Sequence, residues 1–162
     1  MPFFTKLNAV LLGVAIAVST VAFPTVSRVK VLERKVVAEI NNQVIVASVA
    51  KTPLERQEGL AGKSSLTADE GMLFFFEKPD FYGFWMRGVK FPIDIVWILG
   101  NRIAGVVPNV LPPEEASSNA LPIYYPLVRV NKVLELQAGR AARLRAHIGD
   151  LVEIRPILTL RE

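Results

Sequence analysis

The stretch Val36-Val-Ala-Glu-Ile-Asn-Asn-Gln-Val-Ile-Val-Ala-Ser-Val-Ala50 decides the fold class. Two runs rich in β-branched residues, 36–40 and 44–50, flank the pair Asn41-Asn42. Branched side chains favour strands, and asparagine tolerates the positive φ that a two-residue hairpin turn requires. The stretch therefore predicts an antiparallel hairpin at the start of a β domain.

A short helix follows the predicted hairpin. Thr52 suits the N-cap, Pro53 the first helical position and Glu55 the third, which completes a capping box. Gly59 suits the residue after the helix, where a positive φ is needed. Fewer than two turns lie between these signals, so tertiary packing must hold the helix.

The rest of the domain reads as further short strands with frequent turns. We expect strands over 71–77, 93–99, 102–107, 127–136 and 151–157, and a short helical turn from Ala138-Gly139 to Arg145. The segment 108–126 contains five prolines and predicts a long loop, which is often functional. Residues 36–162 are thus expected to form one mainly β domain, a jelly-roll-like β-sandwich or barrel with two short helices.

An apolar segment precedes the domain. Residues 7–27 carry no charge, and as a helix they would span roughly 31 Å, enough to cross a hydrocarbon core. Residues 1–27 therefore predict either a cleaved signal peptide or an uncleaved signal anchor, and 28–35 a basic linker. We favour the anchor, with residues 7–23 in the membrane.

The charges around this segment leave its orientation open. Arg28, Lys30, Arg34 and Lys35 would keep the domain in the cytoplasm under the positive-inside rule. The order of a basic start and an apolar run is that of an export signal. We favour export, which places the domain outside the cytoplasm at the cell envelope.

Composition excludes several kinds of site. The chain has no cysteine, which rules out disulfides, thiol nucleophiles and thiolate metal ligands. His147 is the only histidine, so we expect no metal site. The net charge of +4 is spread along the chain, so we expect no nucleic-acid partner. No phosphate-binding glycine loop or serine nucleophile motif is present, and we expect no cofactor.

The segment 84–94 combines aromatic, thioether, cationic and carboxylate side chains. As a ligand-binding site, Trp85 and Met86 would offer apolar contact, Arg87 would meet an anionic group, and Asp94 would supply a carboxylate. The alternative is a corner between two strands whose aromatic side chains fill the core.

Two carboxylates fall within apolar strands. By alternation, Asp94 shares a face with Val96 and Ile98, and Glu135 lies in a similar run. A carboxylate on an apolar face costs several kcal/mol unless it is paired or hydrogen-bonded. Arg56, Arg87 or backbone N–H groups could partner Asp94, so Arg56, Asp94 and Glu135 are candidates for structural ion pairs. Asp94 and Glu135 could alternatively act as an acid–base pair.

Six motifs in a fixed order carry a family resemblance. They are Thr52–Leu60, Gly71–Phe76, Phe84–Met86, Pro92-x-Asp94, Val133–Gly139 and Gly149-Asp150. In this order the chain resembles the bacterial and archaeal family catalogued as domain of unknown function 192. The resemblance implies a mainly β, jelly-roll-like fold and frequent signal peptides or membrane anchors among relatives. It implies no enzyme activity.

Three positions depart from the family pattern. Ala61-Gly62-Lys63 stands where relatives usually have Met and a basic residue, and Arg87-Gly88-Val89 where Lys-Asn-Thr is usual. Arg145 stands where Gly is usual, which suggests a different helix end.

Three functions stay open at this point. We favour a membrane-tethered or exported domain that binds a small ligand, glycan or peptide at the corner 85–94. The alternatives are an envelope structural or assembly module without a small-molecule site, and a carboxylate-dependent enzyme using Asp94 and Glu135. The oligomeric state does not follow from the sequence.

Overall fold

The computed structural model describes residues 34–113 and 121–157. The predicted signal segment, and most of the linker after it, lie outside these residues. In the described part of the chain, no helix is long and apolar enough to cross a bilayer. The described residues confirm the mainly β prediction. They form β1 (Lys35–Ile40), β2 (Gln43–Ala50), α1 (Pro53–Glu58), β3 (Glu70–Asp80), β4 (Ile93–Leu99), β5 (Arg102–Val110), β6 (Val130–Gln137), α2 (Arg140–Arg143) and β7 (Val152–Pro156).

The seven described strands form one sheet in the order β5-β4-β6-β3-β2-β1-β7. Neighbouring strands are antiparallel, except that β2 and β3 are parallel. A parallel pair needs a crossover, and the connection that carries α1 supplies it. An isolated bridge between Arg102 and Leu151 joins the start of β5 to the residue before β7. The two outer strands thus approach each other at one point, although the sheet is not closed.

The local signals at the start of the domain are confirmed. Asn41 and Asn42 have φ values of 50° and 62°, as the hairpin turn requires. Thr52 and Glu55 form both hydrogen bonds of the capping box, and Pro53 begins α1. The Asn41 side chain also donates to the carbonyl oxygens of Leu144 and Arg145. The hairpin is therefore tied to the end of α2.

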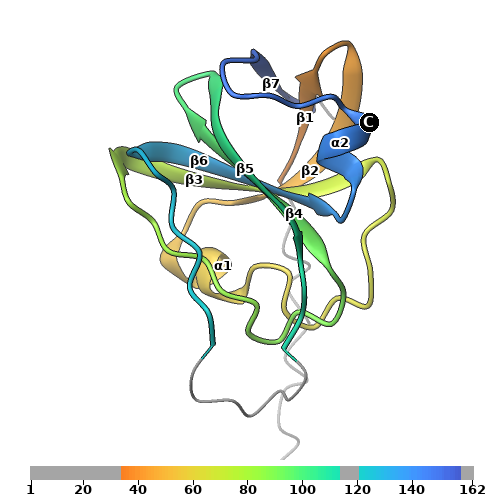
Figure 1. The fold of residues 1–162 in the computed structure, drawn as a ribbon, viewed down its shortest axis with the longest axis vertical. Coiled ribbons are helices and arrows are strands. Elements are labelled where there is room, and N and C mark those ends of the chain that lie inside the picture. Colours follow the sequence, from red (N-terminus) through yellow and green to blue (C-terminus); the bar gives the residue numbers. More distant parts are fainter. Residues whose placement is uncertain (1–33, 114–120, 158–162) are drawn as a thin grey trace, which may run out of the picture. The chain divides into compact units, whose positions relative to one another are not determined.

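The core consists of two clusters on opposite faces of the central strands. The first cluster lies between these strands, the β1–β2 hairpin, β7 and α2, and includes Leu73, Val96, Leu134 and Leu144. The second lies on the other face, beneath α1 and the connecting segments, and includes Phe74, Trp97 and Val133. Figure 1 shows β3, β6 and β4 crossing the middle of the domain, with α1 on one side and α2 on the other. This arrangement buries both faces of β4 and of residues 133–136 in β6, and explains why most of these residues are apolar.

Three strand boundaries differ from the prediction by three residues. β3 continues to Asp80, beyond the predicted end at residue 77. β5 continues to Val110, beyond the predicted end at residue 107. β6 begins at Val130, because Leu127 and Val128 are exposed and lie outside the ladder. The connection between β5 and β6 therefore runs from residue 111 to residue 129, and not from 108 to 126 as predicted.

Candidate functional site

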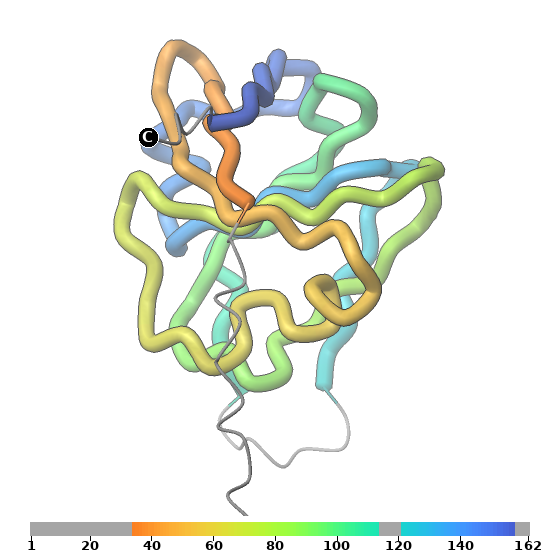
Figure 2. The backbone as a smooth tube through the Cα atoms, turned by 180° about the vertical axis from the view of Figure 1, so that it is seen from behind, coloured from red at the N-terminus to blue at the C-terminus, as the bar shows by residue number. Residues whose placement is uncertain are grey.

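A pocket of about 430 Å³ opens on the face of the second cluster. Its lining comes from α1, β3, the segment 82–89 and the middle of β6. Figure 2 shows two connections that cross the same half of the domain. One follows β2 and passes residue 60, and the other follows β3 and passes residue 85. The lining residues are Pro53, Arg56, Gln57, Glu58, Gly59, Leu60, Phe74, Phe76, Tyr82, Gly83, Phe84, Trp85, Val89 and Glu135.

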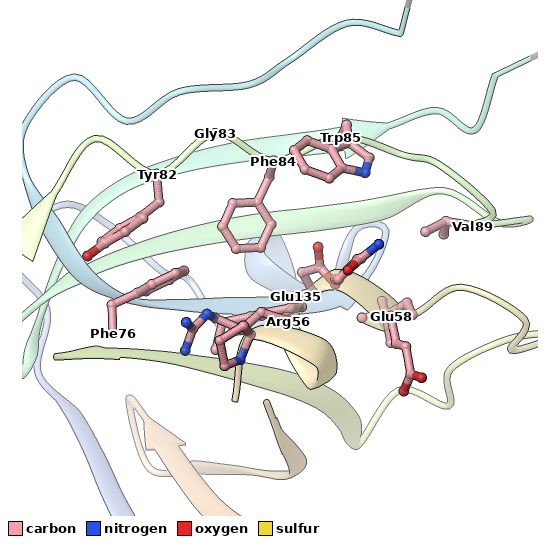
Figure 3. Close-up of a pocket in the computed structure, with 14 residues that line it drawn as sticks. Arg56, Glu58, Phe76, Tyr82, Gly83, Phe84, Trp85, Val89 and Glu135 are labelled. Atoms are coloured by element: carbon pink, nitrogen blue, oxygen red, sulfur yellow. The ribbon is translucent and has the colours of Figure 1, made fainter. Parts of the chain in front are cut away.

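Five aromatic side chains form part of the pocket wall. Phe84 packs edge-on against Phe74, with their ring centroids 4.9 Å apart, and Tyr82 stacks on Phe76. Trp85 keeps 45% of its surface exposed at the rim, where a ligand could reach it. Figure 3 shows Tyr82, Phe84 and Trp85 along one side of the pocket, with Arg56 and Glu135 across from them. Such a wall suits a partly apolar ligand.

Arg56 is held in place by the backbone around it. Its Nη1 donates to the carbonyl oxygens of Lys51 and Phe75, the latter at 3.0 Å. Its guanidinium also lies over the Phe76 ring, 5.0 Å from the centroid. The capping box at Thr52 fixes the start of α1 and so helps to position this side chain. These contacts hold Arg56 in the pocket wall.

Glu135 is the unusual residue of the pocket. Its backbone pairs with Met72 on β3 and with Ile95 on β4, so its side chain rises among the apolar residues of the second cluster. It is 4% exposed, and its Oε2 accepts no hydrogen bond from any residue that the structure describes. Burial raises the pKa of this carboxyl to about 8. At neutral pH the side chain is therefore mainly protonated.

Asp94 has the opposite environment, although it is equally buried. Its Oδ1 accepts from the amides of Asn109 and Gly139, and its Oδ2 from Ala141 at 2.8 Å. These three backbone donors satisfy the carboxylate and tie the end of β5 and the start of α2 to β4. Among the alternatives that the sequence left open for Asp94, the backbone N–H groups are the partners observed.

The other pairings expected for the two carboxylates are not formed. Among the described residues, neither Asp94 nor Glu135 makes an ion pair, with Arg56 or any other cation. Asp94 pairs with Leu136 across the β4–β6 ladder, whereas Glu135 pairs with Ile95. Because side chains alternate between faces, the two carboxyl groups point to opposite sides of the sheet. The geometry therefore does not support Asp94 and Glu135 as an acid–base pair.

The comparisons with known proteins identify the family. The model of DUF192 (Uncharacterized ACR) matches residues 36–154. The chain belongs to the DUF192 family. This confirms the resemblance that the six motifs indicated. No curated protein matches the chain.

Two crystal structures resemble this DUF192 domain. One is a protein of unknown function from Novosphingobium aromaticivorans DSM 12444, which is 30% identical with a TM-score of 0.64 and matches over 82% of this chain and 94% of its own. The other, from Sinorhizobium meliloti 1021, is provisionally called a transcription regulator. It is 28% identical with a TM-score of 0.65, over 75% of this chain and 93% of its own. These similarities support the shared fold of the DUF192 domain.

The four predicted ligand-binding residues lie in four different environments in this DUF192 domain. Trp85 lines the pocket, whereas Met86 is buried in the second cluster. Arg87 is exposed and outside the pocket lining, and Asp94 is bound by backbone amides on the opposite face. Of these four predicted ligand-binding residues, the structure places Trp85 alone in the pocket lining.

Several lining residues of the DUF192 pocket were not predicted. Phe76, Tyr82 and Phe84 line it together with Arg56, which was considered as an ion-pair partner, and Glu135, which was considered as an ion-pair partner or a catalytic acid or base. The density of aromatic residues between 74 and 85 was the available signal. It did not reveal that α1 and β6 would complete the pocket, because those contacts are remote in sequence.

Proposed function

We propose that this DUF192 domain binds a small organic ligand in the pocket between α1, β3, β6 and the segment 82–89. The observation that carries the proposal is the buried carboxyl of Glu135, whose Oε2 has no partner among the described residues. An unpaired polar group in an apolar site is unfavourable, and a ligand that hydrogen-bonds to it offsets the cost. A volume of about 430 Å³ also lies in the range of small-molecule sites.

The pocket favours binding over the two alternatives. An envelope assembly module without a small-molecule site would not need an aromatic-walled cavity with a carboxyl at its floor. An enzyme using Asp94 and Glu135 would need the two groups to face each other, and they lie on opposite faces of the sheet. Ligand binding is therefore the function that this geometry supports best.

We further propose that the domain acts outside the cytoplasm and is tethered by residues 7–23. The support is the uncharged length of that segment and its position behind a basic start. We also propose that the fold is a barrel-like variant of the family's jelly-roll-like sandwich. The bridge between Arg102 and Leu151, which joins the start of β5 to the residue before β7, supports this description.

Ligand-observed NMR with a set of uncharged, cationic and anionic fragments tests the binding proposal. The full chain, purified in maltoside micelles, is compared with Trp85→Ala and with Arg87→Ala as a matched neighbour outside the pocket. We expect some fragments to bind the wild type and Arg87→Ala but not Trp85→Ala. Circular dichroism confirms that each variant is folded. If no fragment distinguishes Trp85→Ala from Arg87→Ala, the pocket is not a binding site.

A further inference from the structure

We propose that the ligand carries an ammonium group, whose positive charge lies between the Glu135 carboxylate and the aromatic faces of the pocket. This inference rests on the proposed function, since it names the chemistry of the ligand at the same pocket.

The wall of the pocket is suited to a cation. The faces of aromatic rings carry partial negative charge and attract cations within about 6 Å, most strongly for tryptophan. One ring of the wall already does so, because the Arg56 guanidinium lies 5.0 Å from the Phe76 centroid. Trp85 is half exposed at the rim, and Tyr82 and Phe84 line the same side. A ligand cation would therefore meet further rings of the same kind.

The charged and titratable groups of the lining favour a cation over an anion when Glu135 is ionised. α1 contributes Arg56 and Glu58. The Arg56 guanidinium donates to two carbonyl oxygens and lies over the Phe76 ring, and the Glu58 carboxylate is exposed. From the segment after β3 comes the Tyr82 hydroxyl, which donates to the Lys78 carbonyl. From β6 comes Glu135, which lacks a partner at Oε2 among the described residues. When Glu135 is ionised, this carboxylate would repel a bound anion, whereas the positive charge of an ammonium group would compensate it.

An uncharged ligand would use Glu135 differently, and pH separates the two cases. A neutral carbonyl would accept a hydrogen bond from the protonated acid, so its affinity would fall as the acid ionises. An ammonium group requires the ionised form. With a pKa of about 8, the ionised fraction of Glu135 is about one in eleven at pH 7 and about ten in eleven at pH 9. Affinity for a permanent cation should therefore rise about tenfold between these pH values.

The test uses choline and 3,3-dimethyl-1-butanol, which have the same shape but differ in charge. Their binding to the full chain in maltoside micelles is measured by NMR titration from pH 6 to 9. We expect choline to bind more tightly than the uncharged analogue, with the tenfold rise toward pH 9. The Glu135→Gln variant should bind choline at least tenfold more weakly and without this rise, and Trp85→Ala should also bind it more weakly.

Three controls separate Glu135 from its neighbours. Arg87→Ala, outside the pocket lining, should bind choline as the wild type does. Glu58→Gln and Tyr82→Phe should keep the rise with pH, because neither residue is the group whose ionisation is required. Loss of the rise in either of these variants would assign the titration to that residue and overturn the role of Glu135.

The remaining outcomes distinguish this inference from the proposed function. If both probes bind equally, or if choline binds more weakly at higher pH, the pocket binds small molecules but does not select a cation. If choline fails to bind at any pH, the ammonium inference is wrong, and the fragment comparison of Trp85→Ala with Arg87→Ala still decides whether the pocket binds ligands at all.

Discussion

Replacing Glu135 with glutamine should stabilise the domain and remove part of its pH dependence. Glutamine has almost the same shape, but it does not ionise. The wild-type carboxyl has a pKa of about 8 in the folded protein, against an ordinary value of 4.5. The folded state therefore binds this proton more strongly than the unfolded chain does. Its contribution to stability is fully present below pH 4.5 and is lost as the pH rises to about 8.

The magnitude follows from the size of the pKa shift. A shift of about 3.5 pH units, at about 1.4 kcal/mol for each unit, corresponds to about 5 kcal/mol between acid and alkaline conditions. At pH 7 most of this loss has already occurred, so the Glu135→Gln protein should be more stable there by about 3 kcal/mol. For a domain of this size, that difference would raise the melting temperature by about 10 °C.

Urea unfolding of both proteins at several pH values measures the effect. The useful quantity is the difference in unfolding free energy between Glu135→Gln and wild type, because contributions from other titrating groups cancel in it. Any difference in packing between the glutamine and the carboxylic acid is constant with pH, so the change of this free-energy difference with pH reports on the ionisation of Glu135. We expect the difference to grow by about 5 kcal/mol from pH 4 to pH 9. A difference that stays constant from pH 5 to pH 8 would show that Glu135 is not desolvated as described.

Three further predictions concern stability and are measured by urea unfolding at pH 7. Asp94→Asn should lower the free energy of unfolding by about 3 kcal/mol, because its NH₂ group would face backbone N–H donors. Asp80→Asn, at the exposed end of β3, is the control and should change this free energy by less than about 0.5 kcal/mol. Equal effects of the two variants would contradict the buried role of Asp94. Thr52→Ala should cost about 1 kcal/mol through loss of the helix cap, and Thr52→Ser should restore most of it; a serine variant as weak as alanine would argue against capping. Arg145→Gly should stabilise the domain by about 1 kcal/mol, because Arg145 is exposed and its φ of 52° is strained for any residue with a Cβ. A destabilised glycine variant would show that the contacts of the arginine side chain outweigh this backbone strain.

The features predicted well from the sequence are those whose causes are local. The hairpin turn depends on Asn41 and Asn42 themselves, and the start of α1 depends on residues within one turn. Arg145 is a position at which the local sequence was misleading. Its departure from the usual glycine suggested a different helix end, yet its backbone takes the left-handed conformation that glycine favours. The surroundings, including the hydrogen bond from Asn41 to its carbonyl, hold it there.

The candidate site was harder to predict because it depends on contacts remote in sequence. Asp94 and Glu135 both occur in apolar strands, and alternation alone treats them alike. Their difference comes from what packs over each face of the sheet. Backbone amides at the end of β5 and the start of α2 reach Asp94, whereas aromatic residues and α1 cover Glu135. Neither environment follows from the residues near the carboxylate itself.

The position of β6 in the sheet has a consequence for how the chain is made. This strand lies between β3 and β4, yet it follows both of them in sequence. Until residues 130–137 leave the ribosome, β3 and β4 each present an unpaired, strongly apolar edge. Exposed edges of this kind favour pairing with other chains. Nascent chains of this protein should therefore depend on chaperones until late in translation, and the pocket, whose floor is Glu135, is among the last features to form.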